Sequence, residues 1–191
     1  MNKNLDEMTN EELWALFPVI LTEHKPYWQE NFRQEKSVLA QAIGLENIVR
    51  INHIGSTAVP GLIAKPTIDI LIEIKNDTDI QRLIANMQRV GYRYIDQPDN
   101  PVSHRYFVKG YTPQGFKGQV FHVHVNYSSD WDELYFRDYL LKHPEIAARY
   151  GNLKLELQKK YEHDRDGYTN AKTDFIKRIT GLARAEISIK H

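Results

Sequence analysis

The feature that most constrains this chain is a strictly alternating segment at residues 67–74, with the sequence TIDILIEI. Isoleucine occupies every second position, and Thr67, Asp69, Leu71 and Glu73 occupy the positions between. Successive side chains of a β-strand point to opposite faces, so this period predicts a strand with one apolar face. Asp69 is predicted on the other face. Such a strand needs neighbouring strands and helices that cover its isoleucine face.

A loop of small residues precedes this strand and contains groups that suit a phosphate. Gly55 follows a predicted strand directly, and glycine lets the backbone approach a phosphate closely. Ser56 and Thr57 can donate hydroxyl hydrogen bonds, and Lys65 can supply a positive charge. An ordinary tight turn explains the same residues. Asp69 after the loop favours ligand binding, because a carboxylate there can hold a divalent ion that bridges phosphates.

Hydrophobic periodicity predicts an α+β fold in one domain, with a small mixed sheet packed by helices. The expected parts are a helical N-terminal segment at about 9–44, a sheet core at about 47–127 and a helical C-terminal part at about 130–187. Within the core, residues 103–109 and 119–127 are predicted to form a long hairpin around the spacer GYTPQGFKG.

Two expectations concern the helical C-terminal part. Residues 154–163 are rich in charge and are predicted to form an exposed helical face. A loop around Gly167 is predicted before a last helix that carries Phe175 and Ile179.

Composition excludes several classes of protein. Lys and Arg total 25 and Asp and Glu also total 25, which argues against a strongly electrostatic nucleic-acid or membrane-surface binder. The chain has no cysteine, so disulfides, thiolate zinc sites and cysteine nucleophiles are excluded. It has no apolar signal peptide and no stretch long enough to span a membrane, so a cytoplasmic location is expected.

The segment at residues 53–74 resembles the nucleotidyltransferase signature, in which a Gly-Ser pair is followed, after a spacer, by an Asp-apolar-acid strand. Twelve residues separate Ser56 from Asp69, which matches that spacing. The second acid is absent, because position 71 is leucine. Glu73 lies roughly 6–7 Å further along the strand, whereas two-metal transfer needs ions within about 4 Å of each other.

The wider sequence is similar to the GrpB-like family of small bacterial proteins, and the similarity covers nearly the whole chain. The segments that carry it are HIGSTAVPGLIAKPTIDIL at 53–71, HRYF at 104–107, HVHV at 122–125, FRDYLLKHP at 136–144, the pair Tyr150 and Lys154, and YTNAKTDFI at 168–176. The family implies a nucleotidyltransferase-like fold.

The resemblance also implies a set of site residues. His122 and His124 share one face of a strand that the superfamily fold places beside Asp69, so these three residues are candidate ligands for Mg²⁺, Mn²⁺ or Zn²⁺. An exposed polar face or histidines that bind phosphate explain the same pair. Basic residues in the family-like segments are candidate triphosphate ligands, although each also fits an ordinary surface charge. These residues are Arg105, Arg137, Lys154 and Lys172.

Two functions follow from these residues. In one, the chain is a nucleotidyltransferase-like enzyme that binds a nucleotide or another small phosphorylated ligand at Gly55 and Ser56. A metal ion on Asp69 then assists group transfer, with Asp69 as the catalytic residue. In the other, the chain is an inactive anion-binding module, which Leu71 favours. The acceptor and the oligomeric state are left open.

Overall fold

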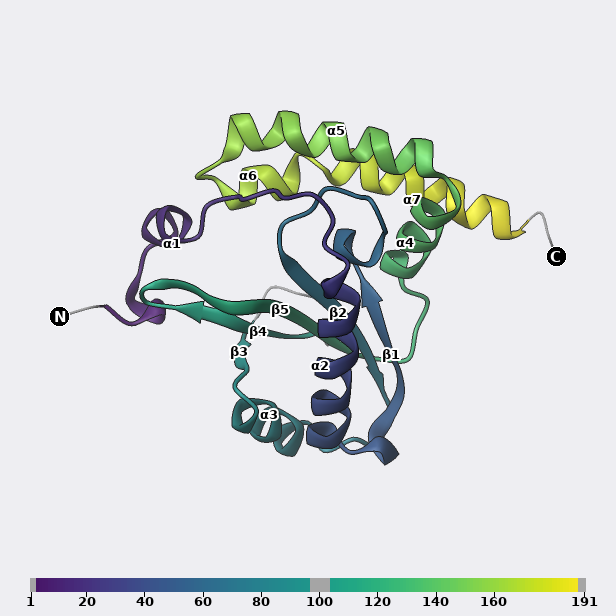
Figure 1. Ribbon diagram of the computed structural model, residues 1–191. Coiled ribbons are helices and arrows are strands. Elements are labelled where there is room, and N and C mark those ends of the chain that lie inside the picture. The colour runs from purple at the N-terminus through teal and green to yellow at the C-terminus, as the bar shows by residue number, and fades with distance from the viewer. Residues whose placement is uncertain (1–2, 97–103, 189–191) are drawn as a thin grey trace.

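The computed structural model describes residues 3–96 and 104–188 (Figure 1). The helices are α1 (Asn10–Leu16), α2 (Tyr27–Ile43), α3 (Ile80–Arg89), α4 (Asp132–Lys142), α5 (Pro144–Tyr161), α6 (Arg165–Asn170) and α7 (Thr173–Ser188). The strands are β1 (Ile48–Ile54), β2 (Thr67–Ile74), β3 (Arg93–Ile95), β4 (Arg105–Thr112) and β5 (Gly115–Tyr127). Short 3-10 turns lie at Leu5–Glu7, Leu45–Asn47 and Ser56–Ala58.

The five strands form one mixed sheet in the order β1-β2-β5-β4-β3. Strands β2 and β5 are parallel, and the other neighbouring pairs are antiparallel. The predicted α+β fold with a small mixed sheet is therefore confirmed. Asp69 lies opposite His122 in the β2–β5 register, which confirms that their strands are neighbours.

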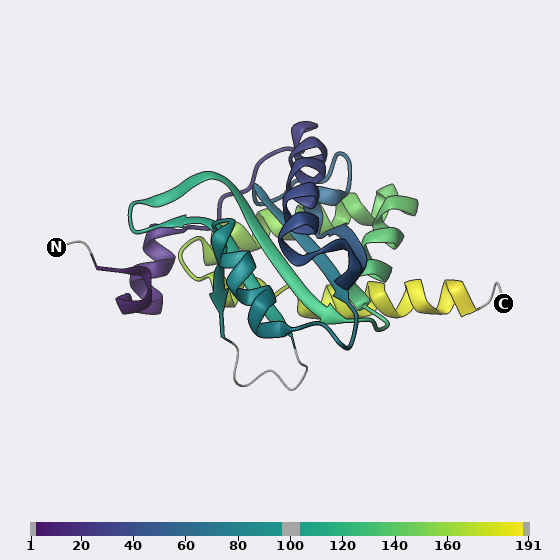
Figure 2. The same cartoon turned by 90° about the horizontal axis from the view of Figure 1, so that it is seen from below.

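The two faces of the sheet are covered by different helices. Helices α2 and α3 pack on one face, and α4 to α7 lie across the other side (Figures 1 and 2). The alternation of β2 decides this arrangement, because its four isoleucines are all fully buried in the core beneath α2 and α3. Asp69 consequently faces the C-terminal helices.

The face of β2 that carries Asp69 is partly covered. Leu71 is 1% exposed and packs with Ile54 and Leu134, beside Trp131 at the start of α4. Glu73, two residues further, is buried and accepts hydrogen bonds from Arg50 (2.6 Å) and Ser128 (3.0 Å). Only the beginning of this face is open to ligands.

The hairpin is longer than predicted. Strands β4 and β5 extend through most of the expected spacer and leave a two-residue turn at 113–114. Gly110 has φ +95, and a Cβ there would lie 2.8 Å from the carbonyl oxygen of Gln119. Gly110 therefore lies at an irregularity in the β4–β5 pairing, between Lys109 and Tyr111, and not in a loop. Residue 103 lies outside the described residues.

Residues 155–163 are exposed or half-buried as predicted, but that expectation fails at Lys154, and the loop predicted around Gly167 is wrong. Lys154 begins the segment predicted as exposed, yet it is 2% exposed, because α5 turns this residue toward the loop after β1. The region around Gly167 is helix α6, not a loop, and Asp164 caps it by accepting a hydrogen bond from the Gly167 N–H (2.7 Å). Among residues 3–96 and 104–188, no helix is long and apolar enough to cross a membrane.

Candidate functional site

All the predicted site residues except Arg105 and Arg137 line a cavity of about 400 Å³ between the sheet and the C-terminal helices, here called the basic cavity. It is bounded by the loop after β1, the starts of β2 and β5, and helices α5 and α6 with the turn before α7. Its ionisable lining residues are Lys65, Asp69, Tyr106, His122, His124, Tyr150, Lys154, Arg165, Asp166, Tyr168 and Lys172. The remaining lining residues are Gly55, Ser56, Thr57, Thr67 and Thr169.

Asp69 and Gly55 form the floor of the basic cavity. Gly55 has φ +71, and a Cβ at this position would lie 2.5 Å from Asp69 Oδ2. The loop therefore needs glycine both for its backbone conformation and for the close approach of the carboxylate. Burial acts to raise the pKa of Asp69. The hydrogen bond from His122 and the nearby charges of His122, His124 and Lys65 outweigh it, so the pKa lies below its ordinary value.

His122 connects Asp69 to the hairpin. Its Nδ1 lies 3.2 Å from Asp69 Oδ1, and its Nε2 lies 2.7 Å from the Tyr111 hydroxyl. Because a carboxylate only accepts, Nδ1 donates to Asp69, and in the neutral ring Nε2 accepts from Tyr111. His124 shares the same face, and its Nδ1 lies 2.9 Å from His104 Nε2. Burial lowers the pKa of His124 to about 4, so its ring is neutral at physiological pH.

The loop after β1 is held from behind by His53. Thr57 is buried and donates its hydroxyl hydrogen to the Thr67 carbonyl (3.0 Å), so it must accept from His53 Nε2 (3.0 Å). The His53 ring also stacks on Phe32, and burial lowers its pKa to about 4. Thr57 is consequently a positioning residue whose hydroxyl is already committed, although its side chain lines the cavity.

Three lysines give the cavity its charge. Lys154 donates to Ser56 Oγ (2.9 Å) and to the Ile63 carbonyl. Burial, together with the nearby charges of Lys172 and Lys65, lowers the pKa of Lys154 to about 7. Burial likewise lowers the pKa of Lys172 to about 7 and that of Lys65 to about 8, with added repulsion from neighbouring cations. These ammonium groups face one another without enough negative charge to balance them.

Two predicted phosphate ligands lie elsewhere. Arg105 is on the opposite face of the sheet, with its guanidinium 5.1 Å from the Tyr127 ring centroid. Arg137, in α4, donates to the His53 carbonyl (2.9 Å) and pairs with Asp138 (2.7 Å), beside a separate hollow between α4 and α7. Both sit in segments that resemble the family, but strand alternation and the helix face direct their side chains away from the basic cavity.

Sequence reasoning missed Arg165 at the cavity. Its guanidinium donates to the Phe17 carbonyl (2.9 Å) and to the Tyr111 hydroxyl (3.3 Å), and it lines the cavity beside Lys65. Arg165 lies outside every motif of the sequence. The only local signal was Asp164 one residue earlier, which could have indicated a helix start.

The residues present do not fit the paired metal ions of a nucleotidyltransferase centre. Asp69 stands alone, since Leu71 is under α4 and Glu73 is occupied by Arg50 and Ser128. Within the described part of the chain, no three His, Cys, Asp or Glu side chains are arranged to hold a metal ion. The predicted set of Asp69, His122 and His124 is assembled on one face, but both His122 nitrogens already have partners.

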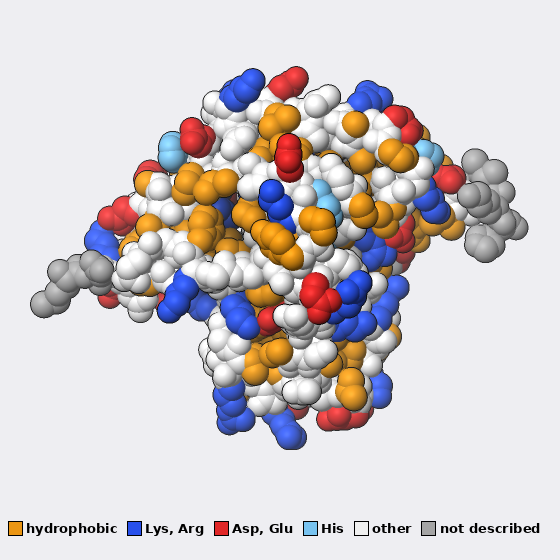
Figure 3. Space-filling view, in the orientation of Figure 1, with side chains coloured by type: hydrophobic (Ala, Val, Ile, Leu, Met, Phe, Trp, Pro, Cys, Tyr) orange, Lys and Arg blue, Asp and Glu red, His pale blue; other side chains and the backbone are white. Residues whose placement is uncertain are grey.

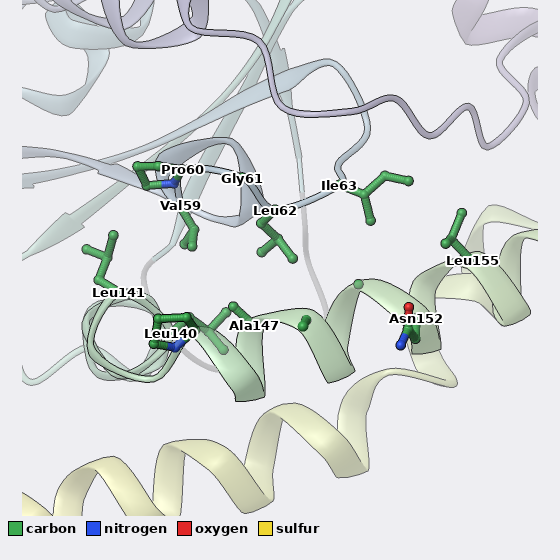
Figure 4. Close-up of a pocket in the computed structure, with 13 residues that line it drawn as sticks. Val59, Pro60, Gly61, Leu62, Ile63, Leu140, Leu141, Ala147, Asn152 and Leu155 are labelled. Carbon is green, nitrogen blue, oxygen red and sulfur yellow. The ribbon is translucent and has the colours of Figure 1, made fainter.

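A larger pocket of about 540 Å³ lies between residues 59–63 and helices α4 and α5 (Figure 4). None of its described lining residues carries a charge. Leu62, Leu140 and Ala147 face it from both walls, as the close-up shows (Figure 4). Such a lining supplies no ionisable side chain, whereas the smaller basic cavity is lined by several.

Comparison with known proteins agrees with this architecture. The family profile described as GrpB protein matches residues 18–181. The chain belongs to the GrpB family. It is 41% identical over 162 residues to a UPF0157 protein of Pseudomonas aeruginosa, covering 84% of this chain and 65% of that protein. It is 34% identical over 165 residues to the glutamate-rich protein GrpB of Alkalihalophilus pseudofirmus, covering 84% of this chain and 93% of that one.

Solved structures place the GrpB chain among nucleotidyltransferase-like folds. The crystal structure of the conserved protein GrpB from Enterococcus faecalis superposes with a TM-score of 0.77 at 34% identity, covering 88% of this chain and 99% of that one. Cid1 in complex with the UTP analogue UMPNPP superposes with a TM-score of 0.51 at 10% identity, covering 85% of this chain and 50% of Cid1. The second likeness is one of fold alone.

Proposed function

We propose that this GrpB protein binds the phosphate groups of a nucleotide, or of another small phosphorylated molecule, in the basic cavity. The observation that carries the proposal is the cluster of Lys65, Lys154 and Lys172, whose pKa values are lowered by burial and mutual repulsion. A multiply charged anion among them relieves that repulsion and restores their protonation. Arg165 adds a fourth cation on the same wall.

The loop after β1 supports the same ligand class. Gly55 lets the backbone approach a bound group closely, and the Ser56 hydroxyl is already held by Lys154 at the cavity wall. The fold of Cid1, whose structure contains a UTP analogue, adds support for a nucleotide. A small molecule suits a cavity of about 400 Å³, which is within the range of ligand pockets.

Calorimetric titration with inorganic tripolyphosphate tests the proposal. We expect Lys65→Ala and Lys172→Ala each to weaken binding about ten-fold or more, because each loses a charge-assisted contact of roughly 1.5–3 kcal/mol. Lys177→Ala is the matched control, since Lys177 is exposed on α7 outside the cavity and its loss should not change binding. Equal affinity in all four proteins would show that the basic cavity is not the phosphate site.

A second candidate function is transfer of a nucleotidyl or phosphoryl group from that ligand to an acceptor. The observation that favours it is Asp69, whose carboxylate lies in the same cavity and is oriented by His122 (3.2 Å). In this function Asp69 acts on the acceptor or on an ion that arrives with the phosphates. Leu71 favours the alternative, a binding module without catalysis.

Product analysis separates the two candidates. The protein is incubated with each nucleoside triphosphate, with Mg²⁺, Mn²⁺ or Zn²⁺, and with the dialysable fraction of a cell extract as the source of acceptor. Pyrophosphate, the product of nucleotidyl transfer, and nucleoside diphosphate, the product of phosphoryl transfer, are measured. Transfer predicts release that Asp69→Asn abolishes while tripolyphosphate binding persists. No release above the Asp69→Asn level with any metal favours the binding module.

A further inference from the structure

A second hollow adjoins the basic cavity on the side of the N-terminal segment. Its volume is about 360 Å³, and Lys65, Thr67 and Arg165 line both spaces. The two spaces therefore adjoin at these shared residues, two of which are cationic. We call this hollow the Tyr27–Phe116 groove, after the aromatic residues on its walls.

Three large hydrophobic side chains line the groove while remaining exposed. Ile20 is 44% exposed, Tyr27 is 54% exposed and Phe116 is 41% exposed. They come from separate parts of the chain: the segment before α2, the start of α2 and the hairpin of β4 and β5. Figure 3 shows hydrophobic side chains gathered around a hollow between that hairpin and the C-terminal helices. Exposed apolar side chains that converge on one hollow mark a ligand surface.

One amide adds polar specificity beside the aromatic rings. Gln119 donates to the Pro66 carbonyl (2.8 Å) and the Val120 carbonyl (3.0 Å), and it accepts from Asn31 (3.0 Å). These bonds use both donors of the Gln119 amide and hold the Asn31 amide beside it on the groove wall. The oxygen and the second N–H of the Asn31 amide can pair with the hydrogen-bonding edge of a heteroaromatic base.

We propose that the Tyr27–Phe116 groove binds the heteroaromatic base of a nucleotide whose phosphates occupy the basic cavity. This proposal rests on the proposed binding of phosphate in the basic cavity, and it adds where the base of the nucleotide binds. Lys65 and Arg165, which line both spaces, contact the phosphates, while the aromatic rings and the Asn31 amide contact the base. The ligand class is then a nucleotide, not inorganic polyphosphate or a sugar phosphate.

Charge decides between this groove and another hollow that opens from the basic cavity beside α4. The hollow beside α4 shares Asp69 with the basic cavity and adds Asp132 and Glu133, so a base bound there would bring the phosphates near two further carboxylates. The described residues that line the Tyr27–Phe116 groove are neutral or cationic. A nucleotide with its base in the groove therefore avoids that additional repulsion.

The experiment compares two probes on the same proteins. Titrations with inorganic tripolyphosphate and with ATP, GTP, CTP and UTP are run on the parent chain, Tyr27→Ala and Phe116→Ala. Leu45→Ala is the control, since Leu45 is exposed outside the groove and the cavity. We expect at least one nucleotide to bind the parent more tightly than tripolyphosphate. Each aromatic variant should lose about five-fold to ten-fold affinity for that nucleotide and none for tripolyphosphate.

Failure of this proposal is distinguishable from failure of phosphate binding. If tripolyphosphate does not bind the parent, the basic cavity is not a phosphate site and both proposals fall. If tripolyphosphate binds and no nucleotide binds more tightly, or if the aromatic variants leave nucleotide affinity unchanged, only the groove is refuted. A loss of nucleotide affinity in Phe136→Leu, with Tyr27→Ala and Phe116→Ala unchanged, would place the base beside α4 and also refute the groove.

Discussion

The substitution Lys154→Met tests whether Lys154 serves to bind a ligand or to hold the loop after β1. Lys154 is 2% exposed, and methionine, one atom shorter and also unbranched, keeps most of the side chain's length while removing the charge and both donated hydrogen bonds, to Ser56 and to the Ile63 carbonyl. If Lys154 exists to bind anions, its burial without a ligand is a cost to folding, and the variant should be more stable than the parent. If it exists to hold the loop, the variant should be less stable.

The lowered pKa sets the size of that cost. A folded-state pKa of about 7 against 10.5 in the unfolded chain destabilises the parent by roughly 4 kcal/mol at pH 7. The variant also loses two hydrogen bonds, and each loss reduces its gain in stability by about 1 kcal/mol. We therefore expect Lys154→Met to be about 2 kcal/mol more stable at pH 7. It should also bind tripolyphosphate at least ten-fold more weakly.

The pH dependence of the folding stability tests the same argument independently. Between pH 7 and pH 10.5 the unfolded chain holds the Lys154 proton and the folded chain does not, so stability rises with pH in this window. From pH 7 to pH 9 the rise from Lys154 is about 2 kcal/mol, and it is absent in the methionine variant. Urea unfolding at both pH values measures this difference. A variant that is less stable at pH 7 and keeps the parent's rise would refute the reasoning.

Two further predictions concern the floor of the basic cavity. Gly55→Ala places a Cβ 2.5 Å from Asp69 Oδ2 at φ +71, so we expect a loss of about 1–3 kcal/mol in urea unfolding and weaker tripolyphosphate binding. Unchanged stability would show that the loop relaxes freely. Leu71→Asp, which supplies the missing acid, buries a carboxylate among Ile54 and Leu134 and should cost about 3 kcal/mol or more. Calorimetry should detect no gain in Mg²⁺ affinity, and a clear gain would contradict the view that α4 closes this position.

Strand β2 shows how far the sequence alone can lead. Its period of two predicted which side chains enter the main core, and the four isoleucines all lie there, although Leu71 and Glu73 on the other face are buried as well. The same period placed Asp69 on the face that β5 completes with His122. Local alternation decides on which face of a strand each side chain lies. The spacing from the Gly-Ser pair to Asp69 decides that the loop and the carboxylate lie together. Both could therefore be predicted from the sequence.

Residues brought in by helices were harder to predict. Lys154 looked exposed because it begins a highly charged stretch, but the face of α5 that carries it packs against the loop after β1. Arg165 entered the cavity because α6 begins there, in a place that read as a loop. Arg105 was predicted as a phosphate ligand but lies outside the cavity, because its strand directs its side chain toward Tyr127. Helix rotation and docking depend on distant packing, which no local pattern encodes.

The basic cavity also explains why the net charge of the chain did not predict an anion-binding site. The whole chain has 25 basic and 25 acidic side chains, so its formal charge gave no sign of an anion site. Within the cavity, four cationic side chains face Asp69 and Asp166. The lysines lie far apart in sequence, on the loop before β2, on α5 and before α7, and only the fold brings them together. Coulomb energy depends on distance and burial, so a chain that is neutral in sum can still hold a pocket in which basic side chains outnumber acidic ones.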